Sequence, residues 1–175
     1  GRIKSIKSIQ QVTSAMKMVA AAKLRTSQLN MEKCRPYSNE VSNLMNNLLL
    51  DCNNSTFALM EKREIKNTLY VVITSDRGMA GAFNTNILKR AQTDIDIDGL
   101  DQSKIICIGK KSRDYFTNRS FDVISSYADF WNSLNFEDAI SIGQEIVDLF
   151  INKKVDKVKI YYNEFKNLAT QIIKN

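Results

Sequence analysis

The stretch Thr68-Leu-Tyr-Val-Val-Ile-Thr-Ser-Asp-Arg-Gly-Met-Ala-Gly-Ala-Phe-Asn84 decides the fold of this chain. Its beginning, residues 68–74, is an apolar, β-branched run that predicts a buried strand, and helical spacing follows from Ala82 to about Thr93. Between strand and helix lies a glycine-containing turn, here called the glycine loop (residues 75–84). A strand, a glycine turn and a helix in this order are typical of a parallel, helix-covered sheet.

The same alternation continues downstream and predicts a Rossmann-like α/β domain over residues 66–175, with a mostly parallel sheet and an incomplete C-terminal end. A short helix is expected after Gly109, and a longer one over Phe136–Asn152 because its apolar residues recur at helical spacing. The further predicted strands are Lys104–Ile108, Phe121–Ile124, Lys157–Tyr162 and a last one within Ala169–Asn175.

Upstream of the domain, residues 2–35 contain no Gly or Pro and predict a continuous helix. A 3-4-3 spacing of apolar residues, typical of a coiled-coil seam, runs through Ile9, Val12, Met16 and Val19. Pro36 is expected to kink or interrupt the helix, with helical spacing resuming at Val41. We therefore predict a shaft over residues 1–52, made of two nearly collinear segments and on the order of 70 Å long.

Charge is concentrated in this shaft. Residues 1–35 hold eight Lys or Arg against one acid, Glu32. Such a basic arm favours an acidic partner, which could be nucleic acid, an anionic membrane surface or acidic protein loops. Residues 1–36 contain no aromatic side chain to stack on bases, and the first twenty lack the Trp, Phe or Leu that a membrane-surface helix usually carries. Packing on helices and acidic protein loops is the preferred interpretation.

The glycine loop is the best candidate for a chemical site, because backbone N–H groups between a strand and a helix can bind phosphate. Its candidate residues are Ser75, Asp76, Arg77, Gly78, Gly81 and Asn84. The loop matches neither G-x-x-x-x-G-K-[ST] nor G-x-G-x-x-G, so a tight structural turn is the preferred interpretation.

Other chemistry has little support in the sequence. The acids Asp94, Asp96 and Asp98 alternate as they would on one side of an extended segment, and we interpret them as a solvated acidic loop rather than a metal site. The chain has no histidine and no recognised catalytic motif, so we expect no catalytic residue, metal or cofactor. The odd set Cys34, Cys52 and Cys107 favours reduced thiols, although the first two could pair if the chain folded back.

Two motifs resemble a known family. Met16-Lys-Met-Val-Ala-Ala-Ala-Lys-Leu-Arg25, preceded by Arg2-Ile-Lys-Ser-Ile6, closely resembles the N-terminal helix of ATP synthase gamma subunits. The glycine loop is similar to that family's Ser/Thr-Asp-Arg-Gly-Leu-Cys-Gly-Gly-Phe/Leu-Asn signature, with Met79-Ala80 and Ala82 as departures. The resemblance extends over the whole chain.

The resemblance implies a non-catalytic rotor-stalk subunit that couples proton-driven rotation of a membrane ring to conformational change in catalytic subunits. Its implied partners are the alpha and beta subunits, an epsilon-type subunit and the membrane rotor c-ring, with no nucleic acid and no membrane insertion. Partner-binding residues implied by resemblance are Met16, Lys17, Met18, Lys23 and Arg25. The complex would lie peripherally on an energy-transducing membrane, either the cytoplasmic face of a bacterial plasma membrane or the matrix face of the mitochondrial inner membrane.

Family members continue further, with a long C-terminal helix that pairs with the N-terminal one. We therefore expect a truncated or engineered fragment, or a second chain that supplies this helix, and an exposed seam. Two alternatives stay open: a basic helical adaptor that binds nucleic acid, and a small enzyme that binds a phosphorylated ligand at Asp76–Asn84.

Overall fold

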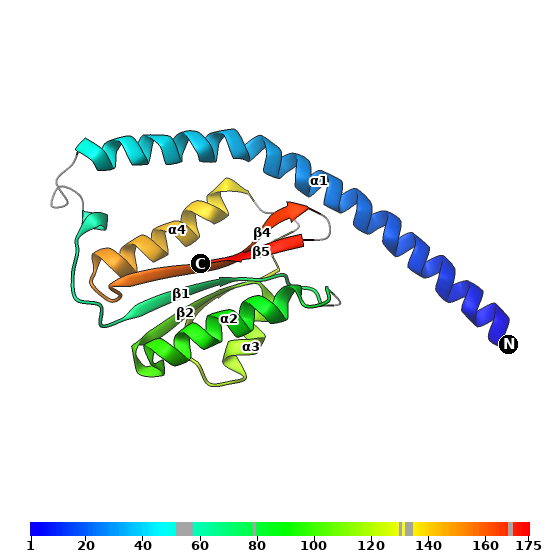
Figure 1. Cartoon of the computed structure of the whole chain (residues 1–175). Helices are drawn as coiled ribbons and strands as arrows, with labels where there is room; N and C mark the ends of the chain where they lie inside the picture. The colour runs from blue at the N-terminus through cyan, green and yellow to red at the C-terminus, as the bar shows by residue number, and fades with distance from the viewer. Residues whose placement is uncertain (52–57, 79, 130, 132–134, 168–169) are drawn as a thin grey trace. The chain divides into compact units, whose positions relative to one another are not determined.

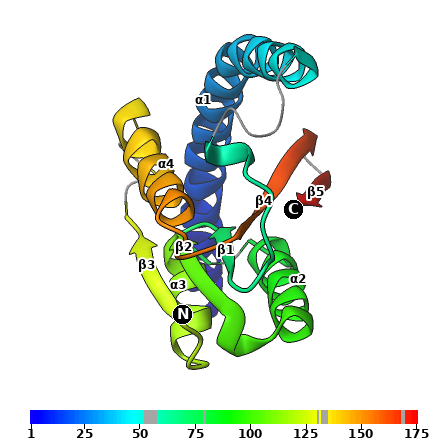
Figure 2. The same ribbon diagram turned by 90° about the vertical axis from the view of Figure 1, so that its left-hand side faces the viewer.

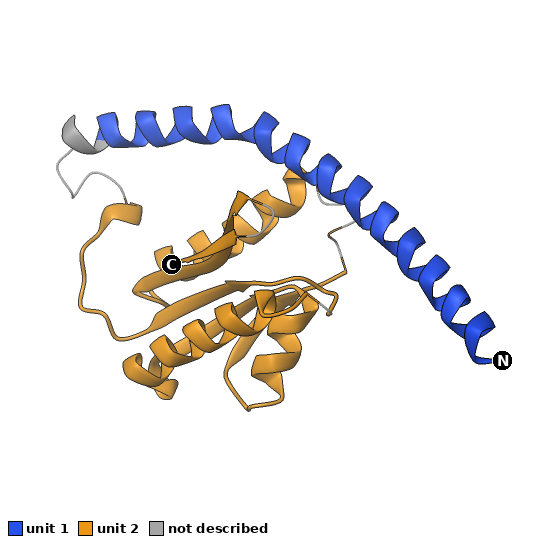
Figure 3. Cartoon of the chain, turned by 45° about the vertical axis from the view of Figure 1, so that its right-hand side comes forward, with its two compact units in different colours: residues 1–56 blue, residues 57–175 orange. Residues whose placement is uncertain are grey.

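The computed structural model describes residues 1–51, 58–78, 80–129, 131, 135–167 and 170–175. Contacts divide the chain into two compact units, residues 1–56 and residues 57–175 (Figure 3). The first unit holds one long helix, and the second holds a five-stranded sheet with its covering helices.

Helix α1 (Arg2–Asp51) is continuous and contains Pro36 in its interior. With 50 residues at 1.5 Å each it is about 75 Å long. The helix is therefore not interrupted at Pro36, and the kink predicted there stays a prediction. A proline costs a helix interior about 3 kcal/mol through one lost N–H and a crowded carbonyl, and helix-forming residues on both sides outweigh that cost. Figure 1 shows that α1 curves along its length.

The sheet of the second unit has the strand order β3-β2-β1-β4-β5. Its first four strands are parallel, and β5 is antiparallel to β4, which confirms the predicted mostly parallel α/β fold. At the centre, Val71 of β1 lies in register between Ile106 of β2 and Ile160 of β4. The strands are β1 (Thr68–Ile73), β2 (Ser103–Ile108), β3 (Val123–Tyr127), β4 (Lys157–Asn167) and β5 (Thr170–Lys174).

Helices cover both faces of this sheet. Figures 1 and 2 show α2 (Phe83–Asp98) and α3 (Lys110–Thr117) on one face and α4 (Phe136–Ile151) on the other. Parallel connections are right-handed, so the path from β1 through β2 to β3 keeps its helices on one face. The return from β3 past β1 to β4 reverses direction and places α4 on the opposite face.

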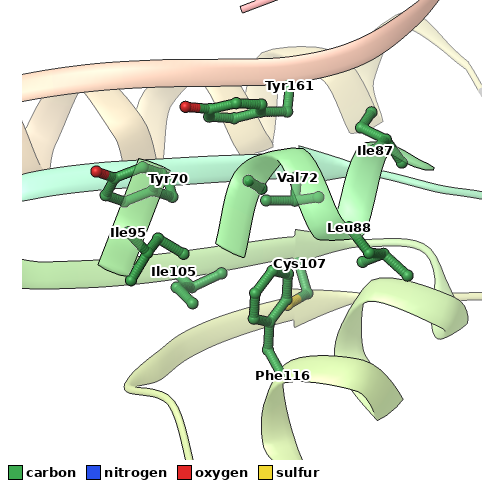
Figure 4. Packing of buried hydrophobic residues seen from close by; sticks show 10 residues of the cluster. Tyr70, Val72, Ile87, Leu88, Ile95, Ile105, Cys107, Phe116 and Tyr161 are labelled. Carbon is green, nitrogen blue, oxygen red and sulfur yellow. The ribbon is translucent and has the colours of Figure 1, made fainter. Parts of the chain in front are cut away.

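Side-chain alternation along β1 divides the core between the two faces. Tyr70 and Val72 lie in a cluster under α2 and α3 (Figure 4), whereas Leu69 and Val71 lie in a second cluster under α4. All four side chains are buried, and this explains why β1 is an uninterrupted apolar run.

Several predicted bounds are corrected by the pairing. β3 starts at Val123 and ends at Tyr127, later than predicted, because it pairs there with β2. β4 continues to Asn167 because its second half pairs with β5. Short 3-10 turns are η1 (Ala58–Met60) and η2 (Leu100–Gln102). Within the described ranges, no helix combines the length and the apolar character needed to cross a bilayer.

Candidate functional site

The glycine loop leaves β1 at the carboxyl edge of the parallel strands, beside the point where the strand order reverses. β1 has β2 on one side and β4 on the other, although the chain visits β2 and β3 first. Doubly wound sheets bind ligands in the crevice at such a point. The loop therefore occupies the position at which this fold most often carries a site.

Asn84, in the first turn of α2, closes the glycine loop onto itself. Its Oδ1 accepts a hydrogen bond from the Ser75 backbone N–H at 3.1 Å, and its Nδ2 donates to Ser75 Oγ at 2.9 Å. Ser75 Oγ in turn donates to the Arg77 carbonyl at 2.7 Å. Gly81 has φ of +56°, a conformation that favours glycine. The side chains of Ser75 and Asn84 are thus occupied within the loop itself.

Asp76 joins the loops that follow three adjacent strands. Its Oδ1 accepts a hydrogen bond from the backbone N–H of Lys110, the first residue of α3, at 2.7 Å. Its Oδ2 accepts one from the backbone N–H of Asp129, just after β3, at 2.9 Å. A carboxylate is favourable at the positive end of a helix. Asp76 therefore occupies the N-terminus of α3, where a bound anion would otherwise be favoured.

Thr74 brings the end of β1 and the start of α3 into close contact. Its Oγ1 accepts a hydrogen bond from the Ser112 N–H at 2.9 Å. Gly109 has φ of +102°, and a Cβ there would lie 2.1 Å from the Thr74 carbonyl oxygen. The site is therefore packed backbone against backbone, with no space for a ligand at this contact.

Arg77 and Gly78 form the exposed tip of the loop. Within the part of the chain that the structure describes, Arg77 makes no side-chain hydrogen bond or ion pair. Gly78 lies beside Lys111, whose Cε would be 3.5 Å from a Cβ at this position. The arrangement gives the loop a structural role and turns one cation outward, toward solvent or an acidic partner.

The acidic triplet lies in helix α2, so its interpretation as a solvated loop is wrong. Asp94 and Asp98 are four residues apart and face the sheet, where Tyr161 donates to Asp94 at 2.6 Å and Lys159 to Asp98 at 2.7 Å. Asp98 also accepts a hydrogen bond from Tyr70. The Lys159 bond, followed by the Tyr70 bond, lowers the pKa of Asp98. The signal missed in the sequence was the helical continuation of the buried Ile87, Ala91 and Ile95.

Asp96 is exposed on the same helix. Within the described ranges, no group of three or more acidic or cysteine side chains is placed to hold a metal ion. Cys34 is exposed and Cys107 is buried, and burial raises the pKa of the Cys107 thiol to about 12. A thiol with that pKa is inert as a nucleophile. Cys52 lies outside the described residues.

The predicted partner-binding residues all lie on α1. Met16 and Met18 are 59% and 65% exposed, and Lys17, Lys23 and Arg25 are exposed as well. The predicted seam is equally accessible, with Ile9, Val12 and Val19 between 57% and 63% exposed. Bulky apolar side chains repeated along a helix at this exposure indicate a surface made for a partner. Which partner they contact stays a prediction.

Asp76 has two partners that the sequence did not indicate. Lys110 and Asp129 contribute backbone N–H groups, which carry no residue-type signal, and they are 34 and 53 positions away from Asp76. Only the parallel arrangement of β1, β2 and β3 brings them to the same edge.

Comparison with known proteins places these features in one family. Residues 1–175 match the family described as ATP synthase. The ATP synthase gamma chain of Chloroherpeton thalassium is 44% identical over 175 residues, which is 97% of this chain and 58% of that protein. The gamma chain of Desulforamulus reducens is 40% identical over 170 residues, or 97% of this chain and 59% of the relative.

A solved structure shares the same architecture. The match is to the central stalk and c-ring structure of the Tetrahymena thermophila mitochondrial ATP synthase, with a TM-score of 0.73 and 26% identity over 93% of this chain and 70% of that one. This chain spans about three fifths of the length of its gamma-chain relatives. It belongs to the ATP synthase gamma-chain family and corresponds to the N-terminal part of its members.

Proposed function

We propose that this chain is the N-terminal part of a central rotor-stalk subunit, which couples rotation of a membrane ring to conformational change in catalytic subunits. The observation that carries the proposal is α1, a continuous helix of 50 residues with exposed apolar side chains and a strong excess of basic charge in its first 35 residues. Its similarity to the Tetrahymena central stalk supports this assignment.

The contribution of such a shaft is mechanical rather than chemical. A helix surface that differs from side to side presents different contacts to each of several equivalent subunits as it turns. A difference of about 1.4 kcal/mol between two such contacts changes a nucleotide affinity tenfold. The shaft itself needs no catalytic group. The glycine loop fits a structural role, because Ser75 and Asn84 are bonded to each other within it and Asp76 is bonded to the loops after β2 and β3.

The partners proposed for α1 are the alpha and beta subunits, with Met16, Lys17 and Met18 facing acidic loops of the catalytic beta subunits. Lys23 and Arg25 extend the same basic surface. The α/β unit is proposed to contact an epsilon-type subunit and the membrane rotor ring. The assembly would then sit peripherally on an energy-transducing membrane.

Reconstitution tests the proposal. The chain is joined to the remaining length of the Chloroherpeton thalassium gamma chain and mixed with purified alpha and beta subunits, and ATP hydrolysis is measured on the isolated complex. We expect an active complex whose rate changes with Met16→Lys and not with Met45→Lys, the same substitution at a second exposed methionine of α1. If alpha and beta assemble without retaining this chain, the shaft role is refuted.

A further inference from the structure

A ten-residue segment precedes β1 and is here called the strap (residues 58–67). Apart from the short turn η1, it has no regular structure and pairs with no strand. Its η1 turn nevertheless contacts α4, and its last residues are bonded to the start of β4. The strap is therefore held by specific contacts rather than by a hydrogen-bond ladder.

Arg63 provides the main contact. Its Nη2 donates to the Phe150 carbonyl at 2.7 Å and to the Val155 carbonyl at 2.6 Å, and its guanidinium carbon lies 4.2 Å from the centre of the Phe150 ring. Phe150 belongs to the last turn of α4, the negative end of the helix dipole, which favours a cation, and its carbonyl also accepts a hydrogen bond from the Lys153 N–H at 3.1 Å. The Arg63 side chain is only 14% exposed, so these bonds are largely shielded from water.

Asp156 completes the contact from the opposite side. Its Oδ1 lies 2.9 Å from Arg63 Nε, a buried atom whose interaction there is an ion pair rather than a well-directed hydrogen bond. Its Oδ2 accepts hydrogen bonds from the backbone N–H groups of Asn67 at 2.9 Å and Lys66 at 3.0 Å. These two bonds, Asn67 first, lower the pKa of Asp156, with Arg63 adding to the effect.

The remaining ion pairs of the strap are weak by comparison. Glu61 lies 3.6 Å from both Arg63 and Lys153, and the Glu61 and Lys153 side chains are 47% and 67% exposed. Exposed pairs at this separation contribute little to stability. The side-chain attachment of the strap is thus concentrated in Arg63 and Asp156. The next residue along the chain, Thr68, already begins the central strand β1.

We propose that Arg63 and Asp156 form a mechanical clamp, which passes force arriving along the strap to α4 and β4 before it reaches β1. The strap is the covalent route from residues 1–56 to the sheet, so a rotating shaft would pull or twist on it. Its role in rotation depends on the proposed function, whereas the clamp itself does not.

Hydrogen exchange on the chain tests the clamp directly. In wild type the Lys66 and Asn67 amides are bonded to Asp156 and should exchange slowly. Arg63→Ala should speed their exchange at least tenfold, Arg63→Lys should give a smaller increase, and peptides from β2 and α2 should stay unchanged. The matched control is Lys62→Ala, which removes an exposed positive charge one position away. Equal exchange in the Arg63→Ala and Lys62→Ala variants would overturn the clamp.

A second measurement tests the clamp under load. In the reconstituted complex on vesicles that also contain the membrane ring and stator, proton pumping is measured per ATP hydrolysed. Arg63→Ala should lower this ratio at least twofold while hydrolysis persists, and Lys62→Ala should leave it unchanged. An unchanged ratio for Arg63→Ala refutes the force-transfer role and leaves the shaft role intact. Failure of the wild-type chain to assemble refutes the shaft role instead, and the exchange result alone then decides whether the clamp exists.

Discussion

Replacing Asp76 with alanine should destabilise the α/β unit by about 2–3 kcal/mol. The change removes two hydrogen bonds to a carboxylate, at 2.7 Å from Lys110 N and 2.9 Å from Asp129 N, and such bonds contribute about 1.5–3 kcal/mol each. Asp76 is half-buried, so water replaces part of the loss and the contribution falls to about 1 kcal/mol for each bond. Loss of a negative charge at the start of α3 adds roughly 0.5 kcal/mol.

Urea unfolding followed by tryptophan fluorescence measures this cost. Trp131 is the single tryptophan of the chain and lies two positions after Asp129, so its emission should report on the affected edge of the sheet. With a urea dependence of about 2 kcal/mol per molar, the midpoint should fall by roughly 1–1.5 M at an unchanged slope. Asp76→Asn keeps one carbonyl acceptor and should lose about half as much.

The control for this series is Asp101→Ala, which removes an exposed acid with no hydrogen bond to its side chain in the described residues. A midpoint for Asp76→Ala that coincides with that of Asp101→Ala would show that the carboxylate does not hold the three loops. The structural interpretation of the glycine loop would then fail.

Three further outcomes follow from particular residues. Gly109→Ala should lower the free energy of unfolding by more than about 4 kcal/mol, because its Cβ would lie 2.1 Å from the Thr74 oxygen. Gly99→Ala meets open space and should lower it only by the strain of the positive φ, about 1–3 kcal/mol. Thermal unfolding of the two variants measures the difference. Burial raises the pKa values of Tyr70, Tyr127 and Tyr161, so the stability that these neutral side chains contribute is fully present below the ordinary pKa of 10.0 and is lost as the pH rises above it. Absorbance near 295 nm at pH 11 should therefore show no more than three of the six tyrosines ionised, with these three still protonated. Pro36→Ala should raise the melting temperature of α1, followed by circular dichroism at 222 nm, because the helix regains an N–H donor; an unchanged melt would mean that Pro36 is not a weak point.

Periodicity predicted most of the elements because it reflects burial directly. β1 is buried on both faces and therefore reads as an unbroken apolar run, and α4 shows helical spacing together with a capping box between Asn135 and Asp138. The glycine loop was located from its position between a strand and a helix. Whether the loop binds a ligand could not be judged from the sequence, because polar groups that could bind one, such as Ser75 and Asn84, can equally bond to each other, as they do in the structure.

The local sequence pattern was misleading where burial or the helical residues on either side outweighed it. The alternating acids looked like an extended segment, but the buried Ile95 holds the helix through Asp98, and two of the three acids meet partners from β1 and β4. Pro36 looked like a break, but a single lost bond does not stop a helix of 50 residues.

The sequence by itself determined the order of strands and helices, the basic shaft and the family motifs, because burial periodicity, charge and short motifs are local properties. The tertiary structure alone decided that β5 runs antiparallel, that Asp76 bridges three loops, and that Arg63 meets the end of α4. These contacts join residues tens of positions apart, often through backbone atoms that are the same in every residue. Their partners become definable only when the sheet brings the chain segments together.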